Sequence, residues 1–207
     1  MKTIFAVLLL AGSGTAWAQS ADVWFSAGES LLSSYLGADP AICNTSATCT
    51  ALGETGKDVQ FTNGFRFGFR FGFNWKDRFG HEIQYAYSRT QLKFNDTTPP
   101  TETGMAIHQG GYNFLAYGTR EEARFRPFAT GGVQFANYVP PGASAAYGGG
   151  ETKLGFNYGA GVKIKLKGFW GLRFDVRQYA TPKPFGLALN SGWIHQTEVS
   201  MGGGIFF

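Results

Sequence analysis

Charge is scarce in this chain. Only 15% of its 207 residues are Asp, Glu, Lys or Arg, whereas an average globular domain has about 25%. The chain nevertheless contains 20 Phe, 9 Tyr and 5 Trp, and so many aromatic residues beside so few charges exclude a disordered polypeptide. Its 30 Gly follow no three-residue period, which excludes a collagen-like chain. A length suited to one domain and a composition rich in Gly and aromatic residues favour strands packed against an apolar environment.

Long apolar runs are also absent beyond the N-terminus. Lys2 precedes the apolar run Ile4–Ala11, which is too short to span a bilayer as a helix. Ala16–Ala18 then has the small-x-small pattern of a cleavage site. We therefore expect residues 1–18 to be a cleaved signal peptide and residues 19–207 to be the mature domain, with an uncleaved hydrophobic anchor as the alternative. No later segment has 18 successive apolar residues, so no transmembrane helix is predicted.

Basic and acidic side chains are present in nearly equal numbers. Without Lys2, the mature chain has 17 basic and 14 acidic side chains, a net charge of +3. A charge this small and scattered does not predict a nucleic-acid partner. The sequence also has only three histidines and contains no phosphate-binding loop, metal-ligand cluster or cysteine nucleophile. We therefore expect no cofactor and no metal.

Cysteine is limited to Cys43 and Cys49, which lie in the polar stretch 38–55. In the oxidising compartment that a signal peptide implies, the two thiols should form a disulfide. Closing this small loop would stabilise it by about 2 kcal/mol. A metal site at this pair is not favoured, because no histidine is close.

One segment, residues 61–75, decides the architecture. Aromatic residues occupy six successive alternate positions, namely Phe65, Phe67, Phe69, Phe71, Phe73 and Trp75. The positions between them hold Gly64, Arg66, Gly68, Arg70, Gly72 and Asn74. A period of two residues is that of a β-strand with two unlike faces. Because glycine suits a crowded interior and an aromatic, uncharged face suits hydrocarbon, the segment has the inverted polarity of a transmembrane β-barrel strand.

The same alternation recurs along the chain. It is clear in Phe79–Ser88, Leu154–Leu166, Trp170–Tyr179 and Trp193–Phe207, and weaker in Val23–Leu32, Ile107–Tyr117 and Pro127–Tyr138. With residues 61–75 this makes eight strands, an even number that closes without an exposed edge. The predicted fold class is therefore an all-β, eight-stranded antiparallel up-and-down transmembrane β-barrel.

Long polar connections alternate with short ones. The long connections are residues 34–58, 95–105, 139–152 and 180–192, and the shorter ones are 76–78, 118–126 and 167–168. Long loops outside and short turns in the periplasm are typical of such barrels, so both termini should be periplasmic. Aromatic girdles should then mark both rims. We expect Phe73, Trp75, Phe79, Phe169, Trp170 and Phe207 at the periplasmic rim, and Tyr85, Tyr87, Tyr138, Tyr179 and Trp193 at the outer rim.

The mature chain resembles the small outer-membrane β-barrel superfamily of Gram-negative bacteria, of the OmpA/OmpX type, over essentially residues 19–207. Its C-terminus resembles the assembly signal of that superfamily, carried here by Val199, Met201, Ile205 and Phe207 and interrupted at Gly203. The segments Arg126–Gly132 and Gly171–Arg177 also resemble strands of bacterial outer-membrane barrels. The resemblance implies an outer-membrane location and, as partners, outer-membrane lipid, lipopolysaccharide, the barrel-assembly machinery and an extracellular ligand held by the long loops. It specifies no activity, because the superfamily includes adhesins, structural anchors, small-solute pores and lipid enzymes.

Nine charged residues lie on the predicted inner faces, namely Arg66, Arg70, Glu82, Lys163, Lys165, Arg173, Asp175, Arg177 and Glu198. Arg66 and Arg70 should face Glu82 on the neighbouring strand. Arg173 and Arg177 should face Glu198 across the last hairpin. Side chains can just fill an eight-stranded barrel, so we expect a lumen closed by ion pairs and a structural or surface-interaction role. The excess of basic residues leaves a narrow, anion-preferring channel as an alternative.

A second alternative is a lipid A-modifying hydrolase. A resemblance to outer-membrane lipid A deacylases would need a His-x-Ser pair with a supporting carboxylate. Here His195-Gln196-Thr197 offers a threonine instead of the serine, and His108-Gln109-Gly110 lacks the hydroxyl. We therefore expect His195 to be an interfacial histidine beside Trp193, and we predict no catalytic residues and no enzyme.

Overall fold

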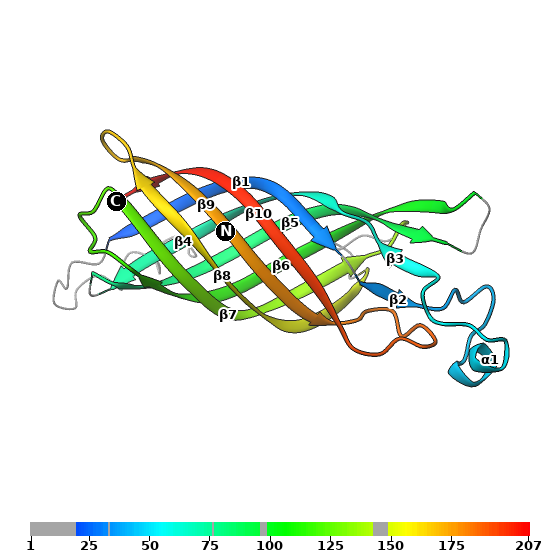
Figure 1. Cartoon of the computed structure of the whole chain (residues 1–207). Coiled ribbons are helices and arrows are strands. Elements are labelled where there is room, and N and C mark those ends of the chain that lie inside the picture. The colour runs from blue at the N-terminus through cyan, green and yellow to red at the C-terminus, as the bar shows by residue number, and fades with distance from the viewer. Residues whose placement is uncertain (1–19, 33, 76, 96–98, 143–148) are drawn as a thin grey trace, which may run out of the picture.

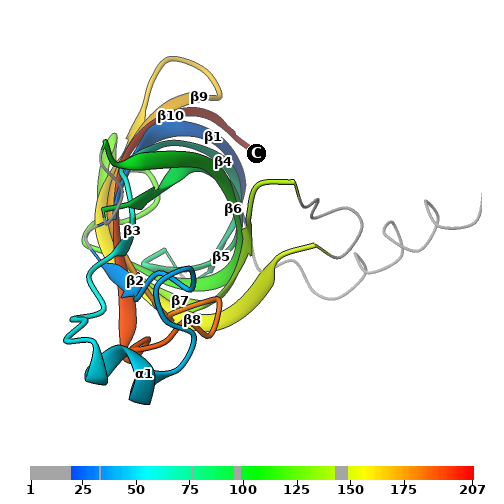
Figure 2. The same cartoon turned by 90° about the vertical axis from the view of Figure 1, so that its right-hand side faces the viewer.

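Eight long antiparallel strands form a closed barrel in the computed structural model, which describes residues 20–32, 34–75, 77–95, 99–142 and 149–207. The predicted signal peptide lies outside these residues. Each long strand pairs with the next one along the chain, and the last pairs with the first. Figure 1 shows the barrel from the side, and Figure 2 shows its strands as a ring. The long strands are β1 (Ala21–Leu32), β4 (Gly64–Trp75), β5 (Phe79–Phe94), β6 (Thr101–Tyr117), β7 (Phe125–Val139), β8 (Glu151–Lys165), β9 (Trp170–Pro182) and β10 (Trp193–Phe206).

The faces of the strands are arranged as the alternation predicts. On β4, the side chains of Phe65, Phe67 and Phe69 are 45–60% exposed on the outside of the barrel, whereas Arg66 and Arg70 are at most 3% exposed inside it. The eight-stranded barrel with an apolar outer surface and a polar interior is therefore confirmed.

The strands are longer at one end of the barrel than the sequence indicates. β5 continues to Phe94 and β6 begins at Thr101, so residues 101–105 of the predicted connection 95–105 belong to a strand. β8 likewise begins at Glu151 and β9 ends at Pro182. The residues added are mostly polar on both faces, and backbone pairing can continue beyond the apolar band because it does not depend on side-chain alternation.

The first long connection forms a small structure of its own, which we call the cap (residues 35–61). It contains β2 (Tyr35–Gly37), α1 (Ser46–Ala51) and β3 (Val59–Phe61). β3 pairs with the far end of β5, with Val59 opposite Phe94, and β2 pairs with β3. The cap thus continues the wall of the barrel at one end and carries α1 beyond it (Figure 1).

The other end of the barrel is compact. The backbone N–H of Phe207 donates to the carbonyl of Ala21 at 2.8 Å, so the start of β1 and the end of the chain lie together. Tight turns join β4 to β5 and β8 to β9, and the second of these contains Gly168 with a φ of +71°. Within the described ranges, no helix is long and apolar enough to cross a membrane.

Candidate functional site

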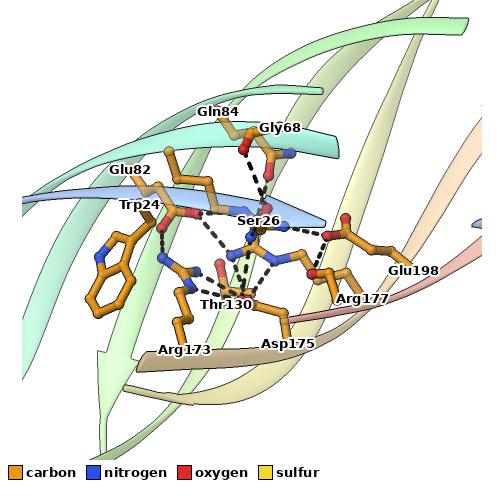
Figure 3. Close-up of polar contacts among 12 residues, drawn as sticks. Trp24, Ser26, Gly68, Glu82, Gln84, Thr130, Arg173, Asp175, Arg177 and Glu198 are labelled. Atoms are coloured by element: carbon orange, nitrogen blue, oxygen red, sulfur yellow. Dashed lines mark hydrogen bonds and ion pairs between the residues drawn. The ribbon is translucent and has the colours of Figure 1, made fainter. Parts of the chain in front are cut away.

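Charged side chains from opposite walls meet in the middle of the lumen (Figure 3). Arg173 and Arg177 on β9 both bind Glu82 on β5 and Asp175 on their own strand. The distance from Arg173 Nε to Asp175 Oδ2 is 2.7 Å, and that from Arg177 Nη2 to Glu82 Oε1 is 2.8 Å. Because β5 and β9 are not neighbours in the sheet, these ion pairs connect the two walls directly.

Glu198 on β10 forms the second centre of this cluster. It receives the guanidinium groups of Arg66, with Nε to Oε2 at 3.0 Å, and of Arg70. The hydroxyl of Tyr179 also donates to it. Arg70 in addition lies 3.4 Å from Asp175, which joins the two centres into one network.

A third group lies nearer the compact end. Lys163 Nζ donates to Asp22 Oδ2 at 2.7 Å and to the hydroxyl of Tyr117 at 2.9 Å. Trp24 Nε1 donates to the same carboxylate at 2.7 Å. The guanidinium of Arg126 lies over the Tyr117 ring, 3.8 Å from its centroid, a favourable cation–π geometry.

Together these residues define what we call the lumen network, six basic and four acidic side chains of which none is more than 3% exposed. A buried ion pair gains little over an apolar filling, but removing one partner costs about 3–5 kcal/mol because the other charge is left unpaired. Each charge in the network therefore depends on keeping a partner of opposite sign. Its members are Asp22, Arg66, Arg70, Glu82, Arg126, Lys163, Arg173, Asp175, Arg177 and Glu198.

The predicted pairing inside the lumen was only partly correct. Glu198 lies opposite Arg177 in the strand register, but its carboxylate binds Arg66 and Arg70 instead. Only β1 separates β4 from β10, and its inward residues at this level, Ser26 and Gly28, are small. The arginines of β4 therefore reach over β1, and Arg70 keeps only a 3.9 Å approach to its predicted partner, Glu82.

Three further predicted positions differ in the structure. Lys165 is half-buried and lies 5.1 Å from the Phe206 ring centroid rather than in the network. Tyr138 and Tyr179, predicted at the outer aromatic girdle, are each 1% exposed and point into the barrel. The strands alternate without a break through these tyrosines, so their odd or even position decides the side on which they lie.

Sequence reasoning missed four inward residues at the compact end: Asp22, Trp24, Tyr117 and Arg126. Asp22 precedes the predicted start of its strand, and Arg126 was assigned to a connection. Extending the predicted strands by one or two residues at these ends would have placed Asp22 and Arg126 on the inner face.

The lumen wall formed by β6, β7 and β8 has buried polar side chains without hydrogen-bond partners among the described residues. The side-chain amides of Asn113, Gln134 and Asn157 are buried, and within the described residues none of their polar atoms has a hydrogen-bond partner. Asn113 and Asn157 both lie opposite Gly132. Buried amides in this state normally bind water or a polar solute, so a polar strip follows this wall beside the lumen network.

The lumen becomes apolar toward the cap. A cluster of buried apolar side chains fills this end, and Phe185 and Leu187, from the connection after β9, pack against it. Within the cluster, the Phe61 ring stacks on the Tyr138 ring, with their centroids 5.7 Å apart. The wall and the cap therefore share one apolar core at this end. Its buried members are Leu32, Leu36, Val59, Phe61, Leu92, Met105, Ile107, Ala136, Tyr138 and Ile194.

A disulfide joins Cys43 to Cys49, as the sequence predicts, with their Cα atoms 5.3 Å apart. Both cysteines pack with Ala38 against Ala188 and Leu189. The backbone N–H of Ala38 also donates to the carbonyl of Ala188 at 2.9 Å. The cap is thereby attached to the connection between β9 and β10.

The residues considered for a hydrolase are not arranged as a nucleophile and its base. The hydroxyl of Thr197 donates to Gln178 Oε1 at 2.7 Å. His195 is exposed on the outer surface near Trp193. Among the described residues there is also no group of three or more His, Cys, Asp or Glu that could hold a metal ion.

Residues 4–204 match the family described as outer membrane protein beta-barrel domain. Among solved structures, the fold is similar to the outer membrane protein OprG from Pseudomonas aeruginosa, with a TM-score of 0.58 at 12% identity, covering 90% of this chain and 96% of that one. It is also similar to Neisserial surface protein A, with a TM-score of 0.51 at 14% identity, covering 90% and 96% respectively. No curated protein sequence matches this chain significantly.

Proposed function

This chain belongs to the outer membrane protein β-barrel domain family, and from that premise we propose that it is a closed barrel with a structural or surface-interaction role. It is an integral protein of the Gram-negative outer membrane. We orient the cap and the long connections outward and both chain ends toward the periplasm, in keeping with the usual asymmetry of such barrels.

The observation that carries the proposal is the lumen network. It connects β4, β5, β9 and β10 across the barrel through Glu82, Asp175 and Glu198. An eight-stranded interior is only wide enough for side chains, so the buried basic and acidic side chains that occupy it leave little room for solute. We therefore assign the network the role of a plug.

The cap supports the surface-interaction part of the proposal. It is held in place by β-pairing to β5, by the Cys43–Cys49 disulfide and by packing against the connection after β9. A segment fixed at three points presents a defined surface rather than a mobile loop. An extracellular ligand would bind there.

The outward C-terminal series supports recognition by the barrel-assembly machinery. Val199, Met201 and Phe207 are 48–71% exposed on the outside of the barrel, and Ile205 shares their face. The engagement of the Thr197 hydroxyl by Gln178 supports a non-enzymatic role, because a hydroxyl committed to that acceptor is not activated by His195.

The proposal is tested by recording from the refolded barrel in planar bilayers. We expect conductance near background, whereas steady conductance in the parent protein would contradict a closed lumen. The same recordings with Lys165→Glu, which reverses a half-buried charge at the end of β8 outside the lumen network, then distinguish leakage around the protein from flow through it. Only flow through the lumen would change its ion selectivity.

The polar strip on β6, β7 and β8 favours a second candidate function, a narrow channel for small solutes. The unpaired amides of Asn113, Gln134 and Asn157 would line it, and the excess of two basic charges in the lumen network would make it prefer anions. This candidate predicts steady anion-selective conductance in the same experiment.

A further inference from the structure

The outer surface of β5 to β8 contains an apolar hollow of about 740 Å³. The ring of Phe135 lies over Gly110, and the large outward residues around this position form the rim of the hollow. The hollow lies on the apolar face of the barrel, where hydrocarbon chains are the surrounding solvent. Its outward lining includes Ile83, Tyr85, Tyr112, Val133, Phe135 and Leu154.

Polar residues follow directly above this hollow, in the direction of the cap. The strand register places Tyr87, His108, Asn137 and Thr152 in the next outward row. The Tyr85 hydroxyl and His108 Nδ1 are 2.7 Å apart, and Asn137 Nδ2 donates to Thr152 Oγ1 at 2.9 Å. These side chains offer hydrogen bonds at the edge of the apolar band.

The next outward row toward the cap contains a positively charged side chain, that of Arg89. Arg89 is exposed and lies opposite Ala106, which in turn lies opposite Val139. It borders a second hollow of about 270 Å³ that also includes Pro140. The structure gives Arg89 no ion pair within the described residues, and the nearest outward carboxylate on β6, that of Glu102, lies opposite Lys93 instead.

The order along this wall is apolar hollow, hydrogen-bonding row and cation, each about 7 Å from the next since rows are two residues apart. A phosphorylated lipid has the same order of hydrocarbon, polar linkage and anion. We propose that this wall binds one molecule of the phosphorylated glycolipid of the outer leaflet, with an acyl chain in the hollow and a phosphate on Arg89.

Two features favour this glycolipid over a phospholipid. The cation lies at the cap end of the barrel, which faces the outer leaflet in the orientation proposed above. The row beneath it contains a histidine, an amide and a hydroxyl, which suit the hydroxyl groups of a sugar better than a glycerol ester. The inference does not depend on whether the lumen conducts.

The test is native mass spectrometry of the folded barrel in detergent with bisphosphorylated lipid A as the probe. We expect one lipid A to be retained, with an affinity about tenfold lower for Arg89→Gln because a charge-assisted hydrogen bond is lost. The parent protein should bind dephosphorylated lipid A as weakly as the Arg89→Gln variant binds bisphosphorylated lipid A. Arg124→Gln removes an exposed charge at the other end of the barrel and should leave retention unchanged.

The hollow is tested separately by filling it. In Gly110→Leu the added atoms meet the ring of Phe135, a movable side chain, and lipid retention should fall. If that variant does not fold, Val133→Trp extends a side chain that is already 65% exposed. Gly203→Leu on β10, where an added Cβ meets nothing within 4 Å, is the matched control.

Three outcomes would overturn the proposal. Unchanged retention in Arg89→Gln would remove the phosphate site. Equal retention of phosphatidylglycerol would remove the assignment to the outer-leaflet glycolipid. A loss in Gly203→Leu as large as that in Gly110→Leu or Val133→Trp would mean that the lipid binds the barrel without a preferred wall.

Discussion

Glu198 shows how much can depend on one inward residue. Arg66 and Arg70 from β4 and Tyr179 from β9 all converge on its carboxylate. It is 1% exposed, so bulk water does not reach a partner that is left unpaired. An outward residue such as Phe69 packs against the neighbouring ring of Tyr85, and a conservative change there removes nothing that the fold requires.

We predict that Glu198→Gln lowers the free energy of unfolding by about 3–5 kcal/mol, because the arginines lose a buried counter-charge. A urea titration in micelles should show the lower midpoint. The matched control is Glu151→Gln. Glu151 forms a salt bridge with Lys153 in which both side chains are more than a quarter exposed, so this change should cost about 0–1 kcal/mol. Equal midpoints for the two variants would contradict the role assigned to the network.

At the scale of the element, β4 depends on the contrast between its two faces. Phe69 lies near the middle of the strand, 45% exposed, opposite Phe25 on β1 and Tyr85 on β5. Its position puts it within the apolar band.

We predict that Phe69→Asp prevents stable insertion, since a charge on the lipid-facing side near mid-depth costs a few kcal/mol. Phe69→Leu keeps the surface apolar and should fold normally. The measurement is the heat-modifiable migration of the folded barrel on gels. Unchanged migration of the Asp variant would mean that the outward face of β4 does not contact lipid.

The cap is an element whose stability is separate from that of the barrel. α1 has six residues, and a helix this short is not stable without support. We predict that replacing both Cys43 and Cys49 with Ser makes residues 38–58 more sensitive to protease, while the urea midpoint of the barrel stays the same. A lower midpoint would indicate that the disulfide also supports the strands.

The strands themselves could be predicted from the sequence because each carries its own evidence, an alternation of large apolar and small or polar residues. Their outer ends could not, since polar residues such as Thr90 and Gln91 continue the backbone ladder without that signal. The choice of partners inside the lumen was also out of reach. It depends on the small size of Ser26 and Gly28 on the intervening strand, which lets Arg66 reach Glu198.

At the scale of the whole molecule, the proposed plug is one of two closures of the lumen in series. The lumen network fills its middle and compact end, and the apolar core shared by cap and barrel fills the other end. Two closures in series have a consequence for conduction that neither has alone, because opening one leaves the other intact.

We predict that conductance appears only when both closures are removed. Replacing residues 34–61 with a short turn should leave the barrel folded, because Leu32 N already donates to Asn63 Oδ1 at 2.9 Å and the ends to be joined are adjacent. Glu82→Ser with Arg177→Ser removes a buried pair together, which is less destabilising than removing one partner. Each change alone should give bilayer recordings near background, and the combined variant should conduct. Conduction after removal of the cap alone would mean that the network does not close the lumen. Conduction after the paired substitution alone would mean that the apolar core at the cap end is permeable.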